Sequence, residues 1–174
     1  LKYYHLDIKV NPEDRTITGS NTIRYQVLNA HNKMQIDLQE PMKITRVTQD
    51  GKELKFQREG NVYYIDLVAD QKVNEIKEVV VFYGGKPKVA VRPPWDGGIT
   101  WSKDKKGNSF IASSCQGLGA SVWWPNKDHM YDEVDSLKMS VSVPDSLWNI
   151  SNGRMSSMCI RNNGKRTTTW VVKN

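Results

Sequence analysis

Residues 113–133, SSCQGLGASVWWPNKDHMYDE, gather several chemical types of side chain in one short stretch. A thiol and a carboxamide stand side by side at Cys115 and Gln116, and two glycines follow at Gly117 and Gly119. The glycines let the backbone turn tightly and approach a ligand or a neighbouring domain. The amide oxygen of Gln116 can accept a hydrogen bond from a ligand, although a loop glutamine more often serves its own fold. Both roles are open at this position.

Metal chemistry has little support in the residue pattern. The histidines His5, His31 and His129 stand far apart, and neither H-E-x-x-H nor a Cys/His pairing with zinc spacing occurs. Acidic residues surround His129, which makes a surface cation site conceivable, but their spacing matches no calcium loop. The alternative is a solvated acidic loop. These acidic neighbours are Asp128, Asp132, Glu133 and Asp135.

Catalysis by this chain alone is also not predicted. Cys115 has no evident base near it in sequence, and there is no G-x-S-x-G elbow and no phosphate-binding glycine loop. We expect Cys115 and Cys159 to be buried free thiols. The net charge of +6 comes from 25 basic and 19 acidic residues spread along the chain, so a nucleic-acid partner is not expected. No apolar run approaches a membrane span, and no signal peptide opens the sequence.

The elements that must position these residues are predicted to be strands. Apolar and polar residues alternate with a period of two nearly throughout, and β-branched and aromatic residues fill the runs. No helical pattern exceeds about two turns. The sequence therefore predicts an all-β fold, a saddle-shaped β sandwich or a large curved, mostly antiparallel sheet.

Turn signals separate the predicted strands. Hairpins are predicted at Asp50-Gly51, Glu59-Gly60, Asn152-Gly153 and Asn163-Gly164, and the basic run at residues 103–106 is predicted to be a solvated hairpin tip. Residues 86–108 are rich in proline and glycine and are predicted to form a long loop carrying Trp95 and Trp101. Within the Trp123-Trp124 pair, one ring is expected to anchor the core while the other faces away.

In order and spacing, the sequence resembles the N-terminal β domain of the zinc aminopeptidases of the aminopeptidase N and leukotriene hydrolase family, which are gluzincin metallopeptidases. The resemblance begins at YYHLDIKVNPEDRTITGSNTIRYQVLN and continues through MQIDLQEPMKITRVTQDGKEL. It is most specific in SFIASSCQGLGASVWWPNKD, which is similar to the family's strand, its C-Q or C-E pair, and its aromatic-Pro-Cys-x-Asp motif. DSLKMSVSVPDSLWNISNG is similar to the strand that follows, so essentially all 174 residues are covered.

The resemblance implies a non-catalytic domain that forms one wall of a substrate cleft. At the position of Gln116 the family has a Gln or Glu that holds the substrate's free α-amino group, so Gln116 and Gly117 are the candidate substrate-binding residues. An ammonium has three donors and needs acceptors in a closed site. The surface facing the catalytic domain is expected to include Gly119, Trp95 and Trp123.

The sequence also departs from the family pattern. Asn126 stands where the aromatic-Pro-Cys motif has its cysteine, and Ser114 stands where another Gln is often found. Neither G-x-M-E-N nor H-E-x-x-H is present, so the resemblance places zinc and its ligands in a catalytic domain outside this chain. Because strand-like patterns reach both Leu1 and Asn174, we expect residues 1–174 to be a single N-terminal domain of a longer metallopeptidase, truncated near its C-terminal edge.

Two other interpretations stay open. Six tryptophans, including Trp95 and Trp101, would also suit a free-standing β-sandwich module that binds carbohydrate or protein. The parent could instead have the architecture of a metallopeptidase without its zinc, and serve as a scaffold. The Trp-Trp-Pro form of the motif resembles exported bacterial members of the family, which favours an extracytoplasmic location.

Overall fold

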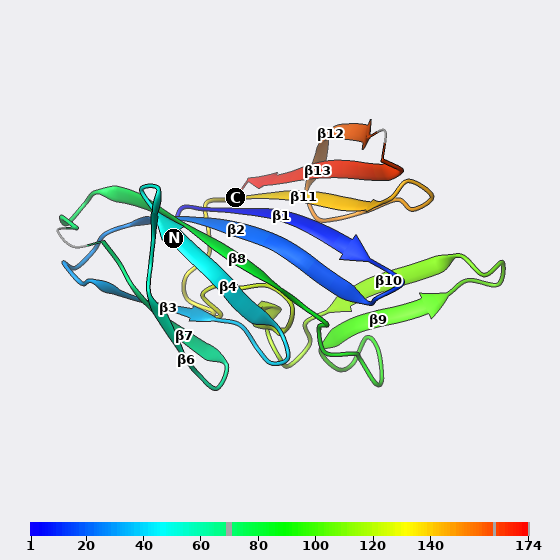
Figure 1. Cartoon of the computed structure of the whole chain (residues 1–174), viewed down its shortest axis with the longest axis horizontal. Coiled ribbons are helices and arrows are strands. Elements are labelled where there is room, and N and C mark those ends of the chain that lie inside the picture. Colours follow the sequence, from blue (N-terminus) through cyan, green and yellow to red (C-terminus); the bar gives the residue numbers. More distant parts are fainter. Residues whose placement is uncertain (69–70, 162, 174) are drawn as a thin grey trace.

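The computed structural model describes residues 1–68, 71–161 and 163–173, and these residues are almost entirely strands (Figure 1). The all-β prediction is confirmed. One short 3-10 helix, η1, covers Ala120–Val122. The strands are β1 (Tyr3–Asn11), β2 (Thr16–Gln26), β3 (Lys33–Asp37), β4 (Lys43–Gln49), β5 (Lys52–Glu53), β6 (Phe56–Glu59), β7 (Val62–Asp66), β8 (Ile76–Gly85), β9 (Gly98–Lys103), β10 (Ser109–Ser114), β11 (Ser136–Pro144), β12 (Arg154–Arg161) and β13 (Lys165–Lys173).

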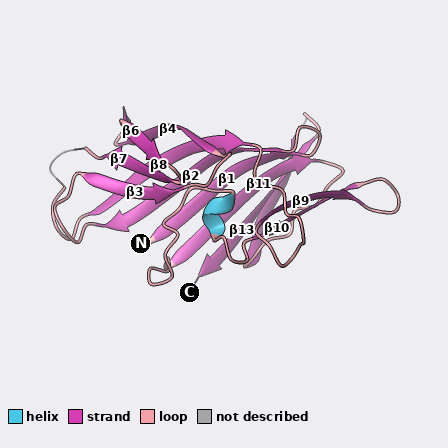
Figure 2. Cartoon of the chain, turned by 90° about the horizontal axis from the view of Figure 1, so that it is seen from below, coloured by secondary structure: helices cyan, strands magenta, loops and turns pink. Residues whose placement is uncertain are grey.

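Eight of the strands form one large curved sheet in the order β12-β13-β11-β1-β2-β8-β4-β5. Neighbouring strands are antiparallel except for β1 and β11, which run parallel with Tyr3 opposite Ser136 and Lys9 opposite Ser142. A three-stranded sheet, β3-β7-β6, and a hairpin, β10-β9, accompany it. Figure 2 shows η1 on one face of the large sheet, between the small sheet and the hairpin.

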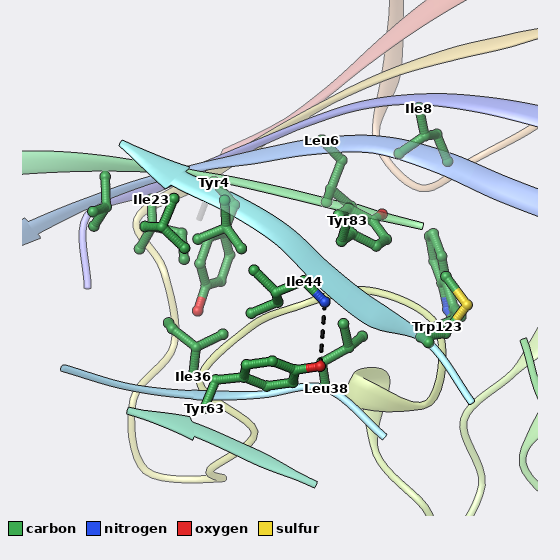
Figure 3. Packing of buried hydrophobic residues seen from close by; sticks show 14 of the residues in the cluster. Tyr4, Leu6, Ile8, Ile23, Ile36, Leu38, Ile44, Tyr63, Tyr83 and Trp123 are labelled. Atoms are coloured by element: carbon green, nitrogen blue, oxygen red, sulfur yellow. Dashed lines mark hydrogen bonds between the residues drawn. The ribbon is translucent and has the colours of Figure 1, made fainter. Parts of the chain in front are cut away.

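The hydrophobic core lies between the large sheet and the β3-β7-β6 sheet. Alternate residues of β1, namely Tyr4, Leu6 and Ile8, are buried, as the period of two predicts. Ile36 and Tyr63 approach them from the small sheet (Figure 3). In β1 the core face therefore carries the apolar residues, and the opposite face carries polar ones such as Asp7 and Lys9.

Three of the predicted hairpin turns are confirmed. Asp50 and Gly51 adopt φ angles of 51° and 75° between β4 and β5, which suits a tight hairpin turn. The turn that follows Glu59 joins β6 to β7, with Gly60 at a φ of 59°. The turn containing Gly164 joins β12 to β13.

The fourth predicted hairpin, at Asn152-Gly153, is wrong. β11 pairs with β13 rather than with β12, so residues 145–153 cross to the sheet edge instead of reversing the chain onto β11. The glycine there has another use. A Cβ on Gly153 would overlap the main chain of Val171 in β13, so its absence allows a close approach of the two segments.

The predicted loop over residues 86–108 is too long. Its second half is β9, which contains Trp101, and it pairs with β10 around a turn at residues 104–108. The basic run therefore does lie at a hairpin tip. Asp104 organises that tip by accepting hydrogen bonds from the main-chain nitrogens of Lys106 and Asn108, at 2.8 and 2.9 Å. No helix in the described part of the chain has the length and apolar character of a membrane span.

Candidate functional site

Gln116 lies at the tip of a tight turn between β10 and η1. The main-chain nitrogens of Leu118 and Gly119 both donate to the oxygen of Cys115, at 3.2 and 3.0 Å. Gly117 and Gly119 have φ angles of 71° and 78°, which favour glycine. Gln116 and Gly117 are exposed, and the Gln116 amide has no hydrogen-bond partner among the described residues. The turn thus presents a carboxamide whose hydrogen-bonding groups are unused.

The end of the turn is held by Gln39, which follows β3. Its side-chain nitrogen Nε2 donates to the oxygen of Leu118 at 2.5 Å and to Oγ of Ser121 at 2.9 Å. Its main-chain nitrogen donates to the oxygen of Ser121 at 2.9 Å. Three hydrogen bonds from one residue therefore fix the segment that follows Gln116.

The start of the turn is held by the loop that precedes β9. Oγ of Ser114 donates to the oxygen of Asp96 at 2.8 Å. A Cβ on Gly97 would lie 2.7 Å from Cβ of Leu118. Because Gly97 has no side chain, Leu118 packs directly against its main chain. These contacts bring the loop and the turn together, although 18 residues separate Asp96 from Ser114 in sequence.

The same loop carries the exposed Trp95. Both carboxylate oxygens of Asp96 accept main-chain hydrogen bonds, from Val91 at 2.6 Å and from Arg92 at 2.8 Å. The bond from Val91, followed by that from Arg92, holds the pKa of the Asp96 carboxyl below its ordinary value. Trp95 is 80% exposed on this bend.

Asp128 closes the turn on its far side. Its Oδ2 accepts a hydrogen bond from the main-chain nitrogen of Ser121 at 3.1 Å. A Cβ on Gly119 would lie within 2.5 Å of Cγ of Asp128, so the carboxyl group occupies the space that a side chain there would need. Gly119 is thus required both for its positive φ and for this approach.

The tryptophan pair attaches the stretch to the core. Trp123 is 8% exposed and belongs to the core, and its ring centroid lies 6.1 Å from that of Trp124. The half-buried Trp124 packs edge-on against Tyr4 at 5.2 Å. Tyr4 accepts a hydrogen bond from the main-chain nitrogen of Lys127 at 3.0 Å, and its burial raises the pKa of the hydroxyl to about 12. Both rings therefore serve mainly the fold, where one had been expected to face away.

Both cysteines are free thiols, as predicted, but the expectation that both are buried is wrong: Cys115 is partly buried and Cys159 is exposed. Burial raises the pKa of the Cys115 thiol, and the neighbouring Trp123 side chain lowers it in part. A raised pKa keeps the group protonated, which suits a small packed side chain better than a nucleophile.

The acidic residues around His129 make contacts other than metal binding. Asp132 forms an ion pair with Lys127, and Asp135 pairs with Lys2. No group of three or more His, Cys, Asp or Glu residues in the described ranges is arranged to hold a metal ion. Lys2 and Lys127 thus neutralise two of these acidic residues.

An apolar groove of about 540 Å³ opens beside the base of the turn. Ile111 of β10, Cys115 and Trp123 line one side, and the core face of β1 and β11 lines the other, including Ile8 and Met139. Ile150, which borders the groove, is 82% exposed. The lining of the groove reaches Cys115, the residue before Gln116, but includes neither Gln116 nor Gly117.

The structure thus brings three of the predicted site residues together, namely Gln116, Gly117 and Gly119. Trp95 is linked to them through the adjoining Asp96 and Gly97, whereas Trp123 lies beneath them in the core, with little area left for a domain interface. Sequence reasoning missed Gln39, which is 79 residues from Leu118. No local pattern marks that residue, because its role depends on where β3 lies.

Known proteins support this description of the fold. The sequence matches the Peptidase M1 N-terminal domain family over residues 1–174. A comparison with curated protein sequences finds no match. Among solved structures, the chain is similar to the M1 zinc metallopeptidase of Deinococcus radiodurans, with a TM-score of 0.76 and 19% identity. A mutant of that enzyme bound to a Tyr-Ser-Ala substrate aligns with a TM-score of 0.76 and 18% identity.

A second relative is the yeast LTA4 hydrolase in complex with bestatin, with a TM-score of 0.73 and 17% identity. The alignments cover 98% of this chain and 38% of the Deinococcus enzyme, and 97% of this chain and 26% of the yeast enzyme. The chain therefore spans well under half the length of these enzymes. Its sequence, together with this shared fold, shows that the chain belongs to the Peptidase M1 N-terminal domain family.

Proposed function

We propose that this chain is the non-catalytic N-terminal domain of a zinc-dependent aminopeptidase, in which it forms one wall of the substrate cleft. In this proposal Gln116 contacts the free α-amino group of the peptide. The observation that carries it is the geometry of the turn: an exposed carboxamide without a partner in the described chain, at a tip whose two ends are fixed by Ser114 and Gln39.

This geometry suits recognition of an amine. The Gln116 amide oxygen accepts one of the three N–H donors of an ammonium group, and the exposed Gly117 beside it leaves room for the substrate main chain. A turn with fixed ends loses little conformational entropy on binding, because its flanks are already ordered. Capturing the amine in this way sets the register, so that the first peptide bond is the one presented for cleavage.

The chemical step is assigned to a catalytic domain in the same parent chain. That domain would supply zinc, which activates a water molecule and polarises the scissile carbonyl. The surface that docks against it includes the Gln116 turn with Gly119, and the Trp95 bend. A carboxylate toward the amine is expected from that domain, since a neutral amide attracts an ammonium less strongly than a carboxylate does.

The test is a pair of substitutions in the parent enzyme, Gln116→Ala and Gln116→Glu. We expect Gln116→Ala to lower kcat/KM for free-amine peptides by about 10- to 100-fold, the range for losing a hydrogen bond to a charged group. Gln116→Glu retains an acceptor and should keep most of the activity. Zinc content should stay unchanged in both.

Gln57→Ala, an exposed glutamine on β6, is the matched control and should leave the kinetics unchanged. Unaltered kinetics in Gln116→Ala would return Gln116 to a structural role. Strong glycan binding by this chain that is lost in Trp95→Ala would instead favour a carbohydrate-binding module.

A further inference from the structure

We propose that Asp128 is the positioning residue for Gln116: its carboxylate fixes the turn that presents the carboxamide to the substrate amine. The inference rests on the function proposed above and adds a residue that touches no substrate. It starts from the two contacts of Asp128 with the turn, the hydrogen bond from the Ser121 nitrogen and the packing over Gly119.

The first contact fixes the end of the turn. Gln39 and Asp128 both bind Ser121. Gln39 donates hydrogen bonds to the side-chain oxygen and to the main-chain oxygen of Ser121, and Asp128 accepts one from its main-chain nitrogen at 3.1 Å. A carboxylate is a stronger acceptor than a neutral group for a main-chain N–H. Every polar group of Ser121 therefore has a partner, and its position is set from two sides.

The second contact restricts one of the two glycines of the turn. Gly119 has no side chain to limit its φ and ψ angles, and it lies three residues after Gln116. The Asp128 carboxyl group lies against it where a Cβ would stand. The carboxylate thus supplies the steric restraint that a side chain supplies at other residues.

Asp128 is itself fixed to β3. Its main-chain nitrogen donates to Oδ2 of Asp37 at 3.0 Å. Asp37 exchanges two main-chain hydrogen bonds with Asn126, at 2.8 and 3.1 Å, and its Oδ1 accepts a hydrogen bond from Gln35 at 3.0 Å. The end of β3 therefore holds the turn through two independent routes, directly through Gln39 and indirectly through Asp128.

The first experiment measures amide hydrogen exchange by NMR in this 174-residue chain. Asp128→Ala should speed exchange of the Ser121 amide by about tenfold, the effect of losing a charged acceptor, and should also speed exchange at Gly119. Asp128→Asn keeps an acceptor oxygen and should restore most of the protection. Glu133→Ala, an exposed acid in the same loop, is the control. Protection in Asp128→Ala equal to that in the control overturns the proposal.

A glycine pair separates the contact from backbone strain. Gly117 and Gly119 both have a positive φ, so an alanine is strained at either position, but only an alanine at 119 displaces the Asp128 carboxyl group. We expect Gly119→Ala to expose the Ser121 amide as Asp128→Ala does, and Gly117→Ala to leave that amide protected. Equal exposure in the two variants would contradict the assigned contact.

The second experiment uses the parent enzyme and a substrate pair that differs only in the α-amino group. Asp128→Ala should reduce the preference for the free-amine substrate by about tenfold, mainly through KM, and Asp128→Asn should rescue it. An unchanged preference in Asp128→Ala, with a reduced one in Gln116→Ala, overturns the positioning role. If Gln116→Ala also leaves the preference unchanged, it is the proposed function that fails, and the exchange data still decide whether Asp128 holds the turn.

Discussion

Asn21 on β2 donates a hydrogen bond from its side-chain nitrogen Nδ2 to the main-chain oxygen of Pro125, at 2.8 Å. Asn21 is fully buried on the core side of the large sheet, and 104 residues separate the two partners. The bond ties the Trp-Trp-Pro segment to a central strand. The bond supplies a donor to the buried Pro125 carbonyl, whereas Oδ1 of Asn21 itself has no partner among the described residues.

Replacing Asn21 should therefore destabilise the domain. We expect Asn21→Leu, which has a similar size but no donor, to lower the free energy of unfolding by about 1–3 kcal/mol by leaving the Pro125 oxygen unpaired. Urea denaturation measures this difference. Thr18→Ala, at an exposed position of the same strand, is the control and should stay within about 0.5 kcal/mol of the wild type. An Asn21→Leu protein as stable as that control would show that the bond contributes little.

The Tyr63 hydroxyl provides a similar link within the core. It accepts a hydrogen bond from the Ile44 main-chain nitrogen at 3.3 Å, connecting β7 to β4 of the large sheet (Figure 3). Tyr63→Phe should lower the free energy of unfolding by about 1–2 kcal/mol, because the Ile44 nitrogen loses its acceptor without a change in packing. Tyr64→Phe, at the next and less buried position of β7, should change stability much less. Equal effects of the two substitutions would refute this assignment.

The two tryptophans Trp95 and Trp123 should respond in opposite ways to truncation. Trp123 is 8% exposed, so Trp123→Ala should cost about 3–5 kcal/mol of unfolding free energy by leaving a cavity in the core. Trp95 is 80% exposed, and Trp95→Ala should change the stability of this chain by less than about 0.5 kcal/mol. If Trp95 docks against the catalytic domain, the same substitution should lower the thermal stability of the parent enzyme. A loss of stability in the isolated chain would mean that Trp95 supports its own fold.

His5 predicts a dependence of stability on pH. Burial, followed by the charge of Lys138, lowers the pKa of the imidazole below its ordinary value of 6.5, while Asp7 and Glu78 act in the opposite direction. The unfolded chain then binds a proton more readily than the folded one, so stability falls as the pH drops from 6.5 toward the folded-state pKa.

Urea unfolding of the wild type and of His5→Gln at about pH 7.5 and about pH 5.5 tests this expectation. The wild type should lose more stability between the two conditions than the variant does, because the variant has no imidazole at this position. A loss of the same size in both proteins would assign the pH dependence to other groups.

Much of the fold was predictable because the side chains of a strand alternate between the two faces of the sheet, so residues two apart share a face and a polarity. The alternation in β1 marks Tyr4, Leu6 and Ile8 as core residues without any knowledge of their partners. The turns at Gly51, Gly60 and Gly164 were found because they require φ angles that glycine adopts most readily. The same preference indicated the turn around Gln116. Strands and turns of this kind are formed by short segments, so the local sequence alone determines them.

The tertiary structure decided which segments meet. The parallel pairing of β1 with β11 sets Tyr3 opposite Ser136, and no local pattern encodes a partner so distant in sequence. The same holds for Gln39 and Asp128, whose side chains reach the Gln116 turn only because the end of β3 lies beside it. Hydrogen bonds between distant side chains and main chain depend on the packing of whole sheets, so they follow from the assembled fold rather than from any single stretch of it.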